Sequence, residues 1–253
     1  LINEYVFALA SAKETEKARK VLEDMLRADP KNGLLWDLAG RFSAVTGKPA
    51  EAEAAFLKAI ELVPDIISPY FQLGLIYTAQ KKFPDAEVRL RKVIEKDEKN
   101  VGAHALLGMV LNSQGEIKAS NKEYRRVLEL SPKNALAANN LASNLADSGS
   151  NLDEALKFAQ TAKEASPEDP NVSDTLGWIY YKKGLFESAY PLIAEAAGKA
   201  KENAVIRYHH GMVLVKKGKN KEAAGELKAA LSLNPEFPGA EEAKKTFDTL
   251  KSF

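Results

Sequence analysis

The sequence predicts an all-α solenoid of about seven helical hairpins followed by a C-terminal capping helix. The first observation is that glycine and alanine recur with a step of 34 residues, as in the series Gly40, Gly74 and Gly108. The second is that prolines keep the same step, and a single inserted residue between Gly149 and Ala155 shifts the later members by one. A period in this range is typical of repeat arrays, in which each unit packs only against its neighbours.

Residues 32–64 show the two helices of one unit. Asn32 can cap a first helix whose apolar residues recur at helical spacing, and Gly47 ends that helix with a turn. A second helix begins near Pro49 and ends at Pro64.

Small residues mark where the two helices of a unit should touch. Gly40 on the first helix and Ala52 on the second allow the backbones to approach closely, and Phe56 should fill the space toward the next unit. The alanines of the same register extend this contact along the array.

The same register divides the whole chain into one continuous solenoid, residues 1–253. The expected units are residues 1–32, 33–66, 67–100, 101–134, 135–169, 170–203 and 204–237, with a cap helix in residues 239–253. Helix-capping residues stand at most boundaries, namely Asn32, Asn100, Asn134, Asp169 and Asn203. In the last helix, Ala243, Phe247 and Leu250 form an apolar stripe that can cover the exposed end of the seventh unit.

Composition excludes several classes of function. Lysine and arginine number 36 against 35 acidic residues, so no excess of positive charge favours a nucleic-acid partner. The chain has no cysteine, and no apolar run approaches the roughly 18 residues needed to span a bilayer, so we expect no membrane insertion of this segment. The compartment stays open between the cytoplasm and the periplasm or cell envelope. Because the chain begins with Leu1, we expect a piece of a longer protein.

The residues that commonly perform catalysis are sparse. The three histidines are His104, His209 and His210, of which His104 falls at a packing position of its repeat. His209 and His210 are adjacent on a helix and point about 100° apart, which is poor geometry for one metal ion. No phosphate-binding loop or nucleophile motif is present. We therefore predict a protein without catalytic activity, metal or cofactor.

The repeat pattern resembles the tetratricopeptide repeat of bacterial proteins. The residues that carry the resemblance are Trp36, Ala39, Gly40, Ala52, Phe56, Ala59 and Pro64, and later units repeat them. The resemblance covers nearly the whole chain. It implies a right-handed superhelix whose concave groove is lined by the first helix of each unit.

The groove positions implied by the resemblance give the candidate partner-binding residues. They are Arg41, Phe71, Leu75, Met109, Asn112, Asn139, Asp174, Trp178, Tyr181, Tyr208 and Met212. They lack the lysine and arginine set that captures an acidic C-terminus. Trp178, Tyr181, Tyr208 and Met212 are the residue types that dominate binding hot spots, and we expect them to form the principal recognition surface. Two interpretations of Trp178 stay open: a groove-facing anchor, or a ring packed in the seam between the sixth and seventh units.

The predicted function is a non-catalytic scaffold that binds a peptide or protein partner in its groove. Stretches such as residues 139–142 and 173–178 are similar to bacterial tetratricopeptide proteins, including envelope lipoproteins linked to exopolysaccharide export or protein secretion. The alternatives are a substrate-selecting array within a larger enzyme, such as a glycosyltransferase, and a scaffold that assembles with itself. The sequence leaves the oligomeric state open.

Overall fold

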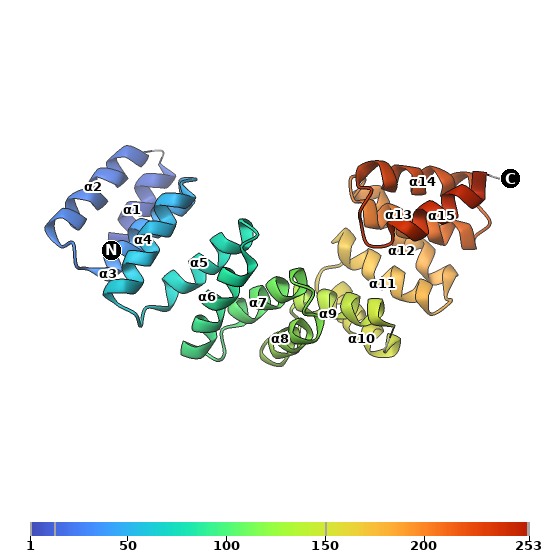
Figure 1. The fold of residues 1–253 in the computed structure, drawn as a ribbon, viewed down its shortest axis with the longest axis horizontal. Helices are drawn as coiled ribbons and strands as arrows, with labels where there is room; N and C mark the ends of the chain where they lie inside the picture. The colour runs from blue at the N-terminus through green and yellow to red at the C-terminus, as the bar shows by residue number, and fades with distance from the viewer. Residues whose placement is uncertain (1, 13, 150, 252–253) are drawn as a thin grey trace. The chain divides into compact units, whose positions relative to one another are not determined.

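The computed structural model describes residues 2–12, 14–149 and 151–251, and these residues form helices and turns without a strand. Figure 1 shows the helices in chain order. Their bounds are α1 Ile2–Ser11, α2 Thr15–Ala28, α3 Gly33–Val45, α4 Pro49–Leu62, α5 Ile67–Ala79, α6 Phe83–Lys96, α7 Val101–Ser113, α8 Ile117–Leu130, α9 Ala135–Ser148, α10 Leu152–Ala165, α11 Pro170–Lys182, α12 Phe186–Lys199, α13 Ala204–Lys216, α14 Asn220–Leu233 and α15 Ala240–Lys251. The expected hairpins and terminal helix are confirmed.

The repeat glycines lie where the two helices of a hairpin cross. A Cβ atom on Gly40 would stand 2.6 Å from the Phe56 ring, and one on Gly108 would stand 2.6 Å from the Tyr124 ring. Phe56 also belongs to a buried cluster that includes Leu73 of the next hairpin. Phe56 therefore packs both against Gly40 in its own hairpin and toward the next hairpin, as the sequence predicts.

Helix starts follow the predicted caps. The side chains of Asn100 and Asn134 each accept a hydrogen bond of 3.0 Å from a backbone N–H of the helix that follows. Asn32, Asp169 and Asn203 cap α3, α11 and α13 in the same way. These bonds satisfy N–H groups that have no partner within the helix.

From the hairpin of α3 and α4 onward, the turn inside each hairpin has a left-handed residue. Gly47 has φ +75°, and the equivalent turns of other hairpins use glycine at the same place. The hairpin of α5 and α6 has Lys81 there instead, with φ 57°. A residue with a Cβ atom adopts this conformation at a cost, so the turn is better suited to glycine.

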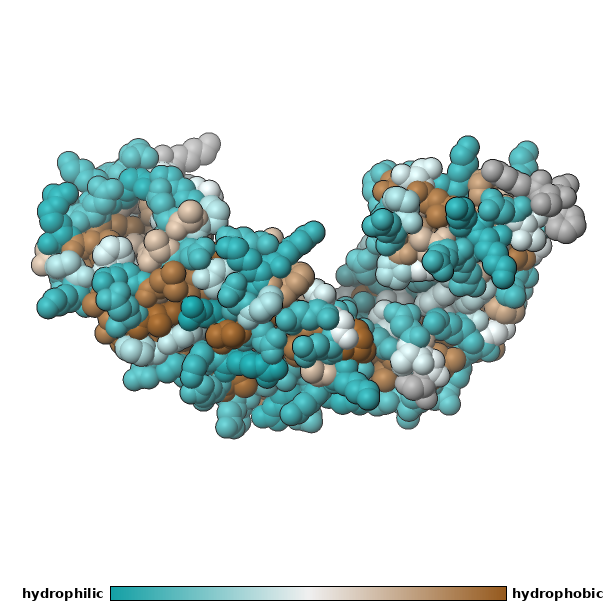
Figure 2. All heavy atoms as spheres, viewed as in Figure 1, coloured by the Kyte–Doolittle hydropathy of each residue, from teal (hydrophilic) through white to brown (hydrophobic). Residues whose placement is uncertain are grey.

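The chain divides into two compact units, residues 1–126 and 127–253, and the boundary falls within α8. In the second unit, α15 packs its stripe of Ala243, Phe247 and Leu250 against a buried cluster that includes Leu227. The predicted capping role of this helix is confirmed. Figure 2 shows that hydrophobic side chains on the visible face are interspersed among hydrophilic ones in both units.

Candidate binding cleft

An open cleft lies within the second unit, along α9, α11 and α13 and beside the turn that leads into α15. Its volume is about 380 Å³. The residues that define its chemistry are Asp147, Asp174, Trp178, Tyr208, His209 and Glu242. Three first helices and the capping helix therefore contribute side chains to one concave surface.

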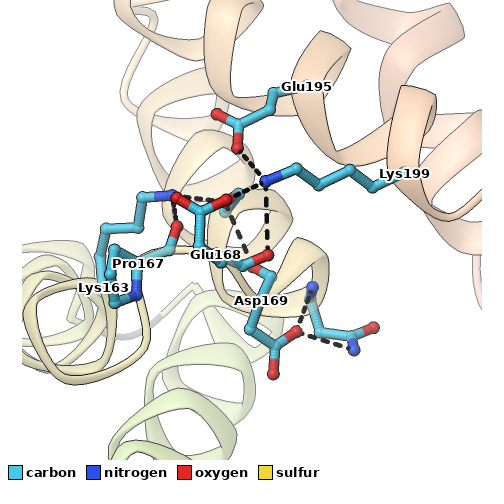
Figure 3. Close-up of polar contacts among 8 residues, drawn as sticks. Lys163, Pro167, Glu168, Asp169, Glu195 and Lys199 are labelled. Atoms are coloured by element: carbon cyan, nitrogen blue, oxygen red, sulfur yellow. Dashed lines mark hydrogen bonds and ion pairs between the residues drawn. The ribbon is translucent and has the colours of Figure 1, made fainter.

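One ion pair and one hydrogen bond at the start of α11 join this helix to its neighbours. Lys199 of α12 donates to Glu168 and Glu195 over 2.7 Å each (Figure 3). Lys163 of α10 donates over 2.7 Å to the hydroxyl of Ser173, the residue before Asp174. The helix that carries Asp174 and Trp178 is thus fixed at its N-terminus from both flanking helices.

Trp178 is half-buried and packs between two parallel rings. Its ring centroid is 4.6 Å from that of Tyr181 and 3.8 Å from that of His209, with interplanar angles of 5° and 15°. Two rings cannot share one face of an indole at these separations, so Tyr181 and His209 cover opposite faces. Trp178 therefore lies in the seam between α11 and α13, and only the edge of its ring is available to the cleft.

Tyr208 and Met212 are buried, with 3% and 6% of their surfaces exposed. Met212 belongs to the cluster beneath α15, which corrects the expectation that it lies on the groove surface. Tyr208 lines the cleft, and its hydroxyl donates to Glu242 over 2.6 Å. Burial, and then the bond to Glu242, raise the pKa of the Tyr208 phenol well above its ordinary value.

Asp174 is the polar centre of the cleft and is 6% exposed. Its Oδ2 atom accepts a hydrogen bond of 2.8 Å from Nδ1 of His209, whereas its Oδ1 atom is buried and has no hydrogen-bond partner among the described residues. Asn139 of α9 also has a buried Oδ1 atom without a partner in the described structure. Buried acceptors without partners destabilise a protein, and a ligand can supply the missing donors.

Negative charge predominates in the cleft. Asp147, Asp174 and Glu242 line it together with one lysine, Lys182. Lys182 donates to the carbonyl oxygen of Ala146 over 3.0 Å and stands 3.8 Å from Asp147. Its charge is therefore already engaged, and the remaining carboxylates favour a positively charged ligand.

A family model described as tetratricopeptide repeat matches residues 8–65, 71–135 and 113–170, more than half of the chain. The chain belongs to the tetratricopeptide-repeat family. A second model, for subunit 3 of the anaphase-promoting complex or cyclosome, matches residues 148–230. A comparison with curated proteins gives no significant match.

Solved tetratricopeptide structures show the same fold. The Cut9-Hcn1 hetero-tetramer of the APC/C is similar over 98% of this chain, with a TM-score of 0.71 and 16% identity, and this chain covers 48% of that one. The chain thus spans about half the length of that relative. A tetratricopeptide repeat protein from Parabacteroides merdae has a TM-score of 0.67 and 17% identity, with 99% and 97% of the two chains covered. YrrB, described as having an unusual peptide-binding site, has a TM-score of 0.58 and 22% identity over 77% of this chain and 100% of that one.

The tetratricopeptide groove positions of the first unit do not join this cleft. Arg41 donates to Asp37 over 3.1 Å, and its guanidinium carbon stands 5.6 Å from the centroid of the Phe7 ring. Phe71 packs beside Gly102. Leu75 and Met109 are 41% and 38% exposed, and Asn112 is also exposed.

His104 has a structural role outside the cleft. His104 is buried between Glu123, 2.6 Å from its Nδ1 atom, and the carbonyl oxygen of Glu98, 3.1 Å from its Nε2 atom, which confirms a packed ring. In the described part of the chain, no group of three or more acidic or histidine side chains is placed to hold a metal ion. No helix there is long and apolar enough to cross a membrane.

Sequence reasoning missed the roles of His209 and Glu242. The sequence pattern indicates only that His209 is a poor metal ligand, and it gives no signal for Glu242. Both line the cleft, because α13 faces α11 and the turn before α15 directs Glu242 toward Tyr208. A signal existed for His209: it lies 35 residues after Asp174, so that adjacent first helices bring the two together.

Proposed function

We propose that this chain is a non-catalytic scaffold that binds a peptide segment of a protein partner in the cleft of its second unit. Membership of the tetratricopeptide-repeat family makes protein interaction the functional class. The specific location is supported by one observation: three first helices and α15 form an open cleft with a buried, unpaired acceptor on Asp174.

The form of the cleft favours an extended segment as the occupant. It is open and runs across successive helices, whereas small-molecule sites usually enclose most of the ligand. The edge of Trp178 and the side chain of Val205 provide apolar contacts beside the carboxylates. The envelope or secretion context, the enzyme-associated array and self-assembly stay predictions of the sequence.

The test is to fill the cleft. Thr175 of α11 lines it, and Thr161 of α10 is a matched control outside it. A displayed library of random dodecapeptides is panned on the intact chain, and the affinities of the enriched peptides are measured by fluorescence anisotropy. Thr175→Trp should abolish most of the binding, and Thr161→Trp should leave it unchanged while both variants keep wild-type helicity. No enriched peptide, or equal binding by Thr175→Trp, would refute this site.

A further inference from the structure

Two aspartates occupy the same place in different repeats. Asp37 lies three residues before the repeat glycine Gly40, and Asp174 lies three residues before Gly177. Both are buried to the same degree, with 6% exposed. The surroundings of these two equivalent carboxylates can therefore be compared within one chain.

Asp37 has partners for both of its oxygen atoms. Ser68 of the next hairpin donates to Oδ1 over 2.8 Å, and Arg41 donates to Oδ2 over 3.1 Å. The positive charge of Arg41 also compensates the buried negative charge. In this repeat the fold itself satisfies the carboxylate.

Asp174 lacks the equivalent partners. The residue after the repeat glycine is Trp178 in place of Arg41, and the residue six before the next repeat glycine is Val205 in place of Ser68. Valine has no donor, and Trp178 is held between Tyr181 and His209. The single bond from His209 leaves Oδ1 unpaired at the cleft.

We propose that a cationic side chain of the peptide partner, arginine or lysine, supplies the missing charge and donor to Asp174. This inference rests on the proposed peptide-binding function and specifies its chemistry. The cleft carries the carboxylates of Asp147 and Glu242 in addition. A guanidinium has five N–H donors and no acceptor, so it is suited to a surface rich in carboxylate oxygens.

The same observations disfavour an acidic segment. A carboxylate in the cleft would face Asp147, Asp174 and Glu242, and the one lysine, Lys182, is already bonded to Ala146 and close to Asp147. An uncharged apolar segment would leave the Oδ1 atom of Asp174 without a hydrogen-bond donor. Charge complementarity therefore selects a basic partner.

The test uses the dodecapeptides enriched on the intact chain by panning. The expected result is that they share an arginine or lysine, and that replacing this arginine by citrulline, or this lysine by norleucine, weakens binding tenfold or more. Asp174→Asn should lower the affinity for the basic peptide by a similar factor. The peptide that contains citrulline or norleucine should bind wild type and Asp174→Asn with equal affinity. Asp37→Asn is the matched control, because it changes the equivalent carboxylate in the other unit and should leave the affinity unchanged.

The outcomes separate this inference from the proposed function. If peptides bind in a manner blocked by Thr175→Trp but lack a basic residue, or tolerate citrulline or norleucine without loss, the cationic partner is refuted and the peptide cleft stands. If no peptide is enriched, or Thr175→Trp binds as well as wild type, both fail. The peptide substitutions leave the protein unchanged, so they decide the question even if Asp174→Asn loses its helicity.

Discussion

Two glycines of the second unit differ in what surrounds them, and this difference predicts opposite effects of the same substitution. A Cβ atom on Gly177 would stand 2.6 Å from Ile193 and 3.2 Å from the backbone oxygen of Ala189, whereas one on Gly198 would meet nothing within 4 Å. Gly177→Ala should destabilise the protein by about 1 to 3 kcal/mol through overpacking. Gly198→Ala should stabilise it by about 0.5 to 1 kcal/mol, because alanine favours a helix. Urea unfolding measures both, and equal effects would contradict the packing described for Gly177.

The buried phenol of Tyr208 predicts a loss of stability at alkaline pH. Burial and the bond to Glu242 raise its folded-state pKa above the ordinary 10.0, so the folded protein retains a proton that the unfolded chain releases. The contribution is therefore present below pH 10 and is lost as pH rises further. Thermal unfolding of wild type and Tyr208→Phe between about pH 8 and 11 should show a steeper decline for wild type. Parallel curves would contradict this assignment.

At the residue scale, the sequence predicts a residue's role correctly when that role depends only on neighbouring residues in the chain. Asn134 caps a helix and Gly47 takes a left-handed turn for reasons that neighbouring residues determine. The faces of Trp178 are covered by Tyr181 and by His209 of another helix, and that arrangement depends on how two helices cross. The sequence therefore left its orientation open.

At the scale of an element, α15 closes the array and forms part of the cleft. It buries Ala243 against the seventh hairpin, and its Glu242 accepts the hydroxyl of Tyr208. A chain ending at Pro238 should lose amide-exchange protection in α13 and α14 first, because α15 packs directly against both of these helices.

The same truncation should weaken binding of the basic dodecapeptides, since the wall that contains Glu242 is removed. Hydrogen exchange followed by mass spectrometry locates the loss, and α3 and α4 in the first unit serve as the internal control. Uniform protection in the truncated and intact chains would show that α15 contributes no cap.

Element positions were predictable because caps, turns and helix periodicity are local signals repeated along the chain. The predicted boundary at Ile66 has no side-chain cap, yet α5 begins there at Ile67, because the repeat register is maintained by packing as well as by caps. The cleft was only partly predictable. The expected groove positions Asp174, Trp178 and Tyr208 line the cleft. Met212 does not, because its side chain, one helix turn after Tyr208, packs in the buried cluster beneath α15.

At the scale of the molecule, the division into two units predicts that the binding activity resides in one of them. Leu128 of α8 packs against the cluster of Ala138, Ala162 and Val172, so a stable fragment should include this helix. Residues 117–253 should remain helical and bind the basic dodecapeptides with the affinity of the full chain. Residues 2–116 should not bind them. Circular dichroism and anisotropy titrations measure both properties, and a helical but inactive C-terminal fragment would contradict the location of the site.

The repetition of the same cap and the same turn has a consequence for how such a gene can change length. Most hairpins begin at an asparagine or aspartate that caps the first helix, as Asn100 and Asn134 do, and turn at a left-handed residue such as Gly115, seven positions after the repeat glycine Gly108. Unequal recombination that copies or removes one whole 34-residue period joins a cap to a turn as before. In a hairpin that has the repeat glycine, an insertion between this glycine and the large side chain that covers it moves the two out of register. Selection can therefore lengthen or shorten this protein in whole hairpins while the acidic cleft of the second unit is inherited intact.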